Sequence, residues 1–181
     1  MAEKNTPAKA AGAMIGYAVL MLGGGGAAYA MAPAGANATT ALIVPGIAAG
    51  LMVLCAVMTL LLRASKPVGM IGIHLGLILP LVFAGGIIPR AFAAKGAVDS
   101  YNAVVEEHGA AIATGEIDES VPLETYIQTV NAERSEDEQV EDHDKSYLMY
   151  TLFALGGLSI AAFVVLLGLR PKAGDRGPAE G

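Results

Sequence analysis

The chain has 181 residues, of which 54% are apolar and only 15% are charged, with 23 glycines and no tryptophan. Soluble domains carry about 25% charged residues, whereas three stretches of this chain have no Asp, Glu, Lys or Arg: Ala10–Leu62, Pro67–Pro89 and Ser146–Leu169. Such runs are long enough to span a bilayer, and they exclude an ordinary soluble enzyme, a nucleic-acid-binding domain and a disulfide-stapled secreted module.

The sequence predicts an all-α, polytopic integral membrane protein with four transmembrane helices. A polar tail over residues 1–9 precedes the first span, expected at about 10–32. A turn rich in proline, glycine and asparagine separates it from the second span, at about 41–62. About 22 residues cover roughly 33 Å as a helix, which is enough for the hydrocarbon core. Within lipid, a helix is the conformation that satisfies every backbone N–H and C=O group of such a segment.

A short basic turn leads to the third span, expected at about 67–89 and closed by Pro89, so that the first three spans occupy residues 10–90. Pro80 lies inside this span and is expected to bend it. A cleaved signal peptide is an alternative for the first span, because two lysines precede it and small residues follow it. Cleavage would leave three helices in the same orientation.

An acidic extramembrane loop, residues 91–145, is expected between the third and fourth spans. Residues 95–145 hold 14 of the 17 acidic residues and three of the 11 basic ones, a net charge of −11. Apolar residues at helical spacing predict two short amphipathic helices here, one before Gly109 and one after Ser120.

The fourth span is expected at 146–170, ahead of a flexible tail over residues 171–181. With four spans, seven basic residues lie near helix ends on one side, and four are spread along the acidic loop on the other. Basic residues near helix ends favour the cytoplasmic side. Both termini are therefore predicted to be cytoplasmic and residues 95–145 periplasmic, in a bacterial inner membrane.

Glycines spaced four residues apart occur once in each of the first three spans. Such pairs give a helix a flat stripe that allows another backbone to approach closely. The pairs are Gly12 and Gly16, Gly46 and Gly50, and Gly72 and Gly76. We expect them to pack within the chain, and the contact surface of a homo-oligomer or larger membrane complex is the alternative.

A run of four glycines, Gly23, Gly24, Gly25 and Gly26, lies within the first span. Each weakens a helix by roughly 1 kcal/mol relative to alanine. Close packing against a bulky neighbour is one interpretation. A flexible or unwound point that lines a permeation path is the other, because transporters bind substrate at broken helices.

His74 is the only ionisable nitrogen base expected within a span, and polar groups in a membrane are candidate functional sites. It could make a structural hydrogen bond, ligate a metal or haem iron, or carry protons. A structural role is favoured because no span contains an acidic partner. We expect its imidazole to be satisfied inside the bundle, by Thr59, by Tyr17, or by the Gly76 carbonyl that Pro80 frees.

No nucleophile motif, phosphate loop or zinc signature occurs, so the sequence predicts no enzyme, catalytic residue, cofactor or metal site. The acidic clusters 136–138 and 141–144 could hold a divalent cation, but they lack the spacing of a calcium loop and are interpreted as a solvated linker. Cys55 is the only cysteine, so no intrachain disulfide can form. Membrane lipids are expected partners and nucleic acid is not.

The segment Gly16-Tyr17-Ala18-Val19-Leu20, followed by Gly23-Gly24 and Tyr29, resembles the first helix of the transmembrane protein fourteen family. Members of that family are small, glycine-rich, four-helix membrane proteins. Ser65-Lys66-Pro67-Val68-Gly69 is similar to the family's turn between helices. The chain departs from the family in its length and its acidic loop. The resemblance implies the movement of fatty acids or other hydrophobic metabolites across a membrane, and it carries over no catalytic residue.

Two functions therefore compete. The first is a non-catalytic structural or assembly subunit of a membrane complex, favoured by the lack of acids within the spans and by the acidic loop. The second is a transporter-like bundle that moves a hydrophobic or amphiphilic solute such as a fatty acid, favoured by the glycine run and by the resemblance.

Overall fold

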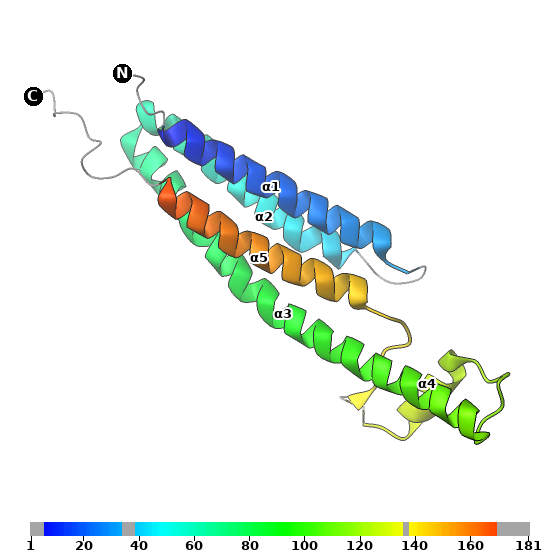
Figure 1. Ribbon diagram of the computed structural model, residues 1–181. Coiled ribbons are helices and arrows are strands. Elements are labelled where there is room, and N and C mark those ends of the chain that lie inside the picture. Colours follow the sequence, from blue (N-terminus) through cyan, green and yellow to red (C-terminus); the bar gives the residue numbers. More distant parts are fainter. Residues whose placement is uncertain (1–5, 34–38, 136–137, 170–181) are drawn as a thin grey trace, which may run out of the picture. The chain divides into compact units, whose positions relative to one another are not determined.

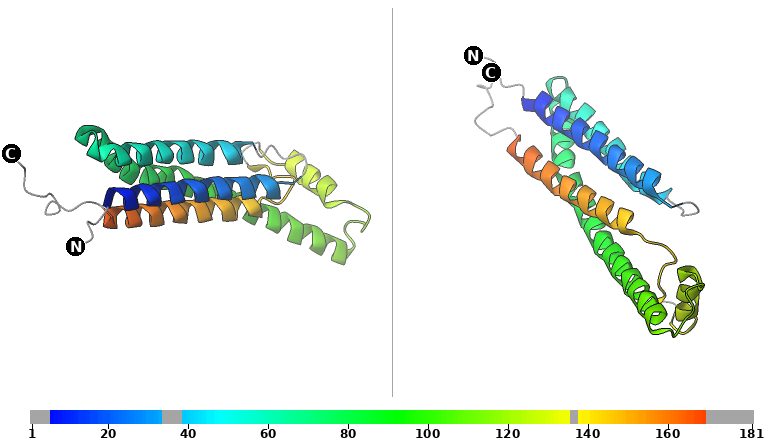
Figure 2. Two further views of the ribbon diagram at one scale, coloured as in Figure 1. Left: turned by 90° about the horizontal axis from the view of Figure 1, so that it is seen from above. Right: turned by 45° about the vertical axis from the view of Figure 1, so that its right-hand side comes forward.

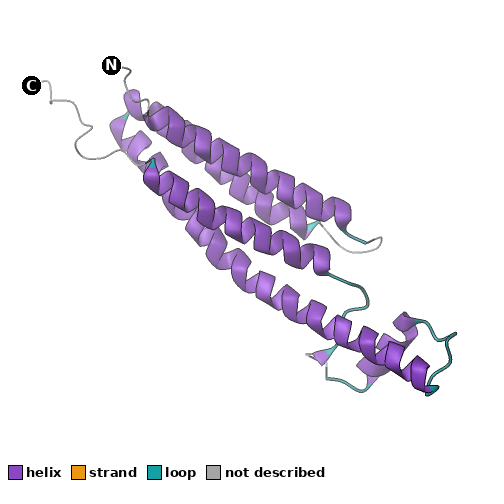
Figure 3. Cartoon of the chain, in the orientation of Figure 1, coloured by secondary structure: helices purple, strands orange, loops and turns teal. Residues whose placement is uncertain are grey.

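The computed structural model describes residues 6–33, 39–135 and 138–169, and this part of the chain is helical, without strands (Figure 3). The expected tail at 171–181, and residues 1–5 of the tail at 1–9, lie outside the described residues. The elements in chain order are α1 (Thr6–Met31), α2 (Thr40–Leu60), a 3-10 turn η1 (Leu61–Arg63), α3 (Lys66–Thr114), α4 (Leu123–Ala132) and α5 (Ser146–Gly168).

Four of these helices, α1, α2, α3 and α5, are long and apolar enough to cross a membrane. The prediction of an all-α chain with four candidate spans is confirmed at this level. The observed bounds of α1, α2 and α5 lie within a few residues of the expected spans.

Helix α3 differs from the expectation, because it continues for 49 residues through Pro80 and through Pro89, where the third span was expected to end. A proline inside a helix removes one backbone hydrogen bond and bends the helix, but it does not end a helix whose neighbours favour that conformation. Pro89 is followed closely by three alanines at 91, 93 and 94, and alanine is the strongest helix former.

The end of α3 lies at Gly115, whose φ of 74° falls in the left-handed region that glycine adopts without steric cost. The N–H of Gly115 donates to the carbonyl of Ile112, and the N–H of Glu116 donates to that of Ala111. These two bonds form the Schellman motif that closes many helices. The first amphipathic helix expected in the acidic loop is therefore the second half of α3.

The chain divides into two compact units. The bundle unit comprises residues 1–88 and 151–181, and the acidic unit comprises residues 89–150. The acidic unit overlaps the segment 91–145 that was expected to form a loop, although α3 continues through its first part as far as Thr114.

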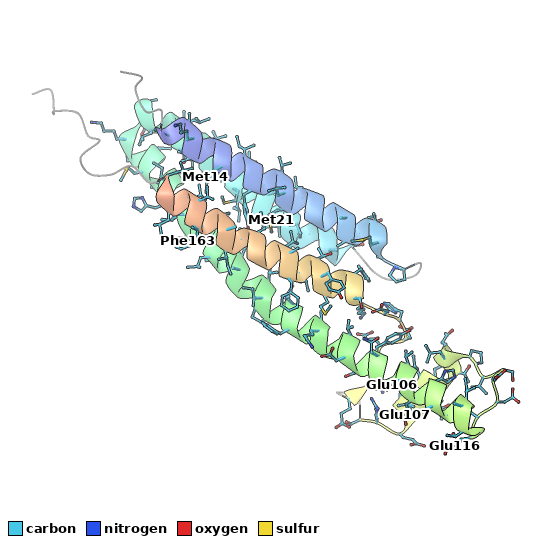
Figure 4. All side chains as sticks on the ribbon, in the orientation of Figure 1. Met14, Met21, Glu106, Glu107, Glu116 and Phe163 are labelled. Carbon is cyan, nitrogen blue, oxygen red and sulfur yellow. The ribbon has the colours of Figure 1, made fainter. Side chains whose placement is uncertain are left out.

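In the bundle unit, α1 and α2 lie side by side, with α5 and the first part of α3 packed along them (Figures 1 and 2). Buried positions recur at intervals of three and four residues, the spacing that lets helices wrap around one another. In α1 and α2 they include Ala11, Met14, Ala18, Met21, Ala48, Met52, Cys55 and Thr59. Met14 and Met21 lie on the inner side of α1 (Figure 4). Most of the large aliphatic side chains lie outside, as Val19, Leu54 and Val164 do, each more than half exposed.

The acidic unit has a small core of its own. Val104 of α3, Ile127 of α4 and Val140 are each at most 5% exposed. The Asn131 side chain at the end of α4 fixes the returning chain, because its amide nitrogen donates to the Val140 carbonyl (2.7 Å) and its oxygen accepts from the Val140 N–H (2.8 Å). The second expected amphipathic helix, after Ser120, corresponds to α4.

Candidate functional site

The third glycine pair lies where α3 crosses α2 and α1. A Cβ atom built on Gly72 would lie 2.7 Å from the Met58 Cβ and 2.7 Å from the Thr59 nitrogen. A Cβ on Gly76 would overlap the Met14 methyl group. Because the Gly72 contacts include α2 backbone, any side chain there would force the two helices apart.

The other two pairs lie in open positions. No heavy atom lies within 4 Å of a Cβ built on Gly12, Gly16, Gly46 or Gly50. Of the six glycines, the described part of the chain thus places only Gly72 and Gly76 in close contact. A packing role for the first two pairs remains a prediction, and it would require something outside this chain.

The four-glycine run also contains both glycines in close contact and glycines in open positions. Helix α1 is continuous through it, from Thr6 to Met31. A Cβ on Gly24 would lie 2.6 Å from Cδ2 of Leu155 in α5, and one on Gly25 would lie 2.8 Å from both the Ala41 carbonyl oxygen and Cγ of Pro45 in α2. Gly23 and Gly26 have no heavy atom within 4 Å of a built Cβ.

The Gly25 contact has a specific physical cause. Pro45 lies inside α2 and has no N–H, so it cannot donate to the carbonyl of Ala41 one turn earlier. The proline ring and this carbonyl together form a raised surface on α2. A residue without a side chain on α1 can lie against that surface, which brings the two backbones close together.

His74 does not lie inside the bundle, and that expectation is wrong. Its side chain is exposed, and its Nδ1 is 2.7 Å from the carbonyl oxygen of Met70 in the same helix. Since a carbonyl can only accept, Nδ1 carries the hydrogen. An imidazole that reaches back one turn is satisfied by its own helix, so it needs neither Thr59 nor Tyr17.

Two hydroxyl groups that sequence analysis did not pair join α1 to α5. The Tyr17 hydroxyl lies 2.8 Å from the Ser159 Oγ, and Ser159 itself donates to the Leu155 carbonyl at 2.8 Å. Ser159 has one proton and uses it on Leu155, so Tyr17 is the donor in the contact between the hydroxyls. Both residues are at most 3% exposed. The available signal was that polar side chains in apolar spans tend to bond across helices.

A third buried hydroxyl, that of Thr59, lies at the crossing of α1 and α2. Thr59 donates to the Cys55 carbonyl at 2.8 Å, and its Oγ1 is 3.8 Å from the Met14 sulfur. Besides Tyr17, Thr59 and Ser159 are the only buried residues with a polar side chain in the described part of the chain. Each has a partner, so these groups hold helices together without leaving an unsatisfied atom in an apolar interior.

The acidic unit carries its charges in exposed positions. Glu106, Glu107 and Glu116 project from the end of α3 and the turn after it (Figure 4). Slight desolvation raises the pKa of Tyr126, followed by the charge of Glu107, a hydrogen bond with Glu107 and the charge of Glu116. The exposed carboxyl groups at the end of α3 thus repel added negative charge nearby.

The two acidic clusters are held by local contacts. The hydrogen bond from His143 lowers the pKa of Asp142, Lys145 pairs with Glu141, and Ser135 donates to Glu138. Among the described residues, no three His, Cys, Asp or Glu side chains are grouped to hold a metal ion. Residues 136 and 137 of the first cluster lie outside the described part.

Comparison with known proteins adds no assignment, since no protein-family model, curated protein or solved structure matches this chain. The resemblance to the transmembrane protein fourteen family therefore remains a prediction from its few residues. The candidate site that the described residues support is the buried helix crossing around Gly72, Gly76 and Thr59, together with the Tyr17–Ser159 contact. These contacts hold neighbouring helices together.

Proposed function

We propose that the chain is a non-catalytic structural or assembly subunit of a membrane complex. The bundle unit spans the membrane as four helices, and the acidic unit is presented to partners at the membrane surface. The observation that carries this proposal is the tightly packed interior of the bundle unit, in which the hydroxyl groups of Tyr17, Thr59 and Ser159 bond to neighbouring helices or to their own helix.

The glycine run supports the same proposal. A permeation path at Gly23–Gly26 would need an opening, whereas a Cβ on Gly24 would meet the Leu155 side chain and one on Gly25 would meet the Ala41 carbonyl and the Pro45 ring. Two of the four glycines therefore favour close packing, and α1 stays helical where an unwound point would be needed for solute binding.

The outer surface of the bundle unit supports a membrane location. Leucine, isoleucine and valine side chains are exposed along α1, α2, α5 and the first part of α3. In water such a surface would favour aggregation, whereas lipid tails solvate it without cost. Membrane lipids are accordingly the partners of this surface.

Orientation follows from the basic residues. Arg63 and Lys66 border the turn between α2 and α3, while the acidic unit carries most of the carboxylates. Basic turns favour the cytoplasm. We place both termini in the cytoplasm and the acidic unit in the periplasm, in a bacterial inner membrane.

A transporter of fatty acids or similar solutes is the competing proposal, and its support is the resemblance of the first span to the transmembrane protein fourteen family. The two proposals make opposite forecasts for the purified protein. An assembly subunit is found in a particle larger than one chain and moves no solute, whereas a transporter moves solute without other subunits.

The test is to extract the tagged chain from its native membrane in mild detergent and to measure the protein mass of the particle. We expect a mass well above the 18.4 kDa of one chain. Asn131→Ala, which removes the bonds that close the acidic unit, should release the chain from the particle, and Asn102→Ala, at an exposed position of α3, should not.

Purified chain in lipid vesicles provides the second arm. We expect a fluorescent fatty acid to cross these vesicles no faster than protein-free vesicles. A single-chain mass in detergent, together with fatty-acid movement that Gly25→Leu abolishes, would replace the proposal with the transporter.

A further inference from the structure

One nitrogen of His74 has no hydrogen-bond partner among the described residues. The bond from Nδ1 to the Met70 carbonyl uses the only N–H group of a neutral imidazole. The other nitrogen, Nε2, keeps a lone pair that can accept a hydrogen bond, and no described residue donates to it. Because the His74 side chain is exposed, the imidazole lies on the outer surface of the bundle unit.

The surroundings of His74 on α3 are apolar. Met70, Ile71 and Ile78 lie one turn before or after it, and all three side chains are exposed. The nearest charged residue in the sequence, Lys66, is about 12 Å away along the helix. In the proposed membrane location, His74 therefore lies in the hydrocarbon region, where neither water nor lipid tails donate hydrogen bonds.

His74 is an exception among the polar groups of the bundle unit. The hydroxyls of Tyr17, Thr59 and Ser159 are buried and bonded. Apart from residues in the first and last turns of the helices, His74 is the only exposed polar side chain in the described part of this unit. An acceptor in lipid without a donor is unfavourable, so a donor from outside the chain would stabilise this surface.

A second copy of this chain does not supply that donor. In a two-fold dimer with the two His74 side chains face to face, two Nε2 acceptors would meet, and they cannot bond to one another. Any other contact between copies would need an exposed donor at the same depth, and the described helices of the bundle unit present none. The donor therefore belongs to a different chain.

We propose that His74 is the docking point for a transmembrane helix of a different subunit. This helix lies along the face of α3 that carries Ile71, His74 and Ile78, and its serine, threonine, tyrosine or asparagine side chain donates to Nε2 of His74. The apolar side chains supply contact area, and the hydrogen bond fixes the position of the helix along α3. The inference rests on the proposed assembly function and adds the contact surface and the donor chemistry of the partner.

Site-specific photo-crosslinking in the native membrane tests this contact. A photoreactive benzoylphenylalanine replaces Ile78, and in the matched control it replaces Leu54 on the outer face of α2; the two side chains are 52% and 55% exposed. We expect position 78 to crosslink to one other membrane protein and position 54 not to crosslink to it.

Two variants of His74 test the hydrogen bond. With the photoreactive group at 78, His74→Leu should lower the ratio of crosslinked to free chain by about 3- to 16-fold, the range for one hydrogen bond between membrane helices. His74→Gln should retain most of the crosslink, because its side-chain carbonyl still accepts. His74→Leu should leave the melting midpoint of the purified chain unchanged, since His74 is exposed and its printed bond is to its own helix, and this excludes misfolding as the cause of a lost crosslink.

Three results would overturn the inference: a crosslink at position 78 between two copies of this chain, equal crosslinking from position 54, or a loss in His74→Gln as large as that in His74→Leu. The last result would indicate metal ligation, which glutamine does not replace. The particle mass in mild detergent separates the two proposals. A mass well above 18.4 kDa without a His74-dependent crosslink overturns this inference alone, and the mass of one chain overturns the proposed function as well.

Discussion

The bundle unit and the acidic unit place opposite kinds of residue in their interiors. The bundle unit buries mainly alanine, glycine and methionine and leaves most of its leucine, isoleucine and valine side chains outside, although Ile73, Ile87, Leu155 and Leu166 are buried. The acidic unit buries Val104, Ile127 and Val140 and leaves its carboxylates outside. Water drives large apolar groups inward, whereas lipid does not, so helices in lipid associate through close fit. The contrast supports the proposal that the bundle unit lies in lipid and the acidic unit in water.

The two units also differ in the way they bond their polar groups. In the bundle unit a hydroxyl chain, Tyr17 to Ser159 to the Leu155 carbonyl, runs between helices that are already packed. In the acidic unit the Asn131 amide replaces a missing backbone partner and closes the chain on a core of three buried residues. Close packing between helices should therefore dominate the stability of the bundle unit, whereas single hydrogen bonds should contribute more to the stability of the acidic unit.

The largest expected effect comes from a substitution that disrupts the close packing of α3 against α2. Gly72→Leu must push α3 away from α2, since even a Cβ would lie 2.7 Å from the Thr59 nitrogen. Overpacking costs about 1–3 kcal/mol or more, so we expect a loss of monodisperse protein and a lower midpoint in detergent thermal melts. Gly50→Leu, at an open position of α2, is the control and should change the melting midpoint little. Equal losses from the two variants would mean that close fit does not govern the bundle unit.

The next effect belongs to the acidic unit. Asn131→Ala leaves the N–H and the carbonyl of Val140 without their side-chain partner, which costs about 1–3 kcal/mol in a buried setting. We expect faster hydrogen–deuterium exchange across residues 123–140, with exchange in α1 and α2 unchanged. Asn102→Ala supplies the reference at an exposed site. Faster exchange in both units after Asn131→Ala would show that they do not open independently.

The sequence predicts more about one unit than about the other. Charge-free length is sufficient to find four spans, and helical spacing is sufficient to find α4. The buried face of each span is harder to predict, because both faces are apolar and hydrophobic periodicity carries no signal there. Residue size separates the faces only in part, and it cannot separate six identical glycines, of which Gly72 and Gly76 are in contact and four lie in open positions.

Two further differences between sequence and structure have local causes. The end of α3 was expected at Pro89, but a proline bends a helix that alanines sustain, and the stop lies at Gly115, where a positive φ is needed. His74 was expected inside the bundle because a polar imidazole that faces lipid without a hydrogen-bond partner costs free energy. The nearest acceptor, the Met70 carbonyl, is one turn away in its own helix, and no spacing rule on neighbouring helices would identify it.

A smaller effect is expected from the hydroxyl chain. Tyr17→Phe and Ser159→Ala each remove the contact between α1 and α5 without adding volume. Hydrogen bonds between membrane helices contribute about 0.6 kcal/mol on average and rarely more than about 1.7 kcal/mol. We expect each variant to lower the melting midpoint slightly, and the double variant to lower it less than the sum of the two, because they remove one shared bond. Strict additivity would indicate that the two hydroxyls act separately.

The smallest expected effect is a dependence of the stability of the acidic unit on pH. It distinguishes the two units, because the buried polar groups of the bundle unit are hydroxyls and not carboxylates. The hydrogen bond from His143 lowers the pKa of Asp142 below its usual value of 3.8, so folding favours the carboxylate. A depressed folded-state pKa gives stability that is present above about pH 4 and is lost as the pH falls through the folded-state pKa. Asp142→Asn should therefore increase exchange in residues 138–146 at pH 7 relative to the unaltered chain.

That difference isolates one carboxyl group among the 14 acidic residues of 95–145, because the two proteins differ only at position 142. As the pH falls below about 4, Asp142 becomes neutral in the unaltered chain as well, and the difference between the two proteins should close. Carbon-detected NMR of the Asp142 carboxyl group, recorded as a function of pH, measures its titration midpoint directly. Its midpoint should lie below 3.8 and should rise toward 3.8 in His143→Ala. A midpoint that His143→Ala leaves unchanged would remove the hydrogen bond as the cause, and the segment 141–144 would then be held by the Lys145–Glu141 pair and by the bonds from Ser146 to Asp144.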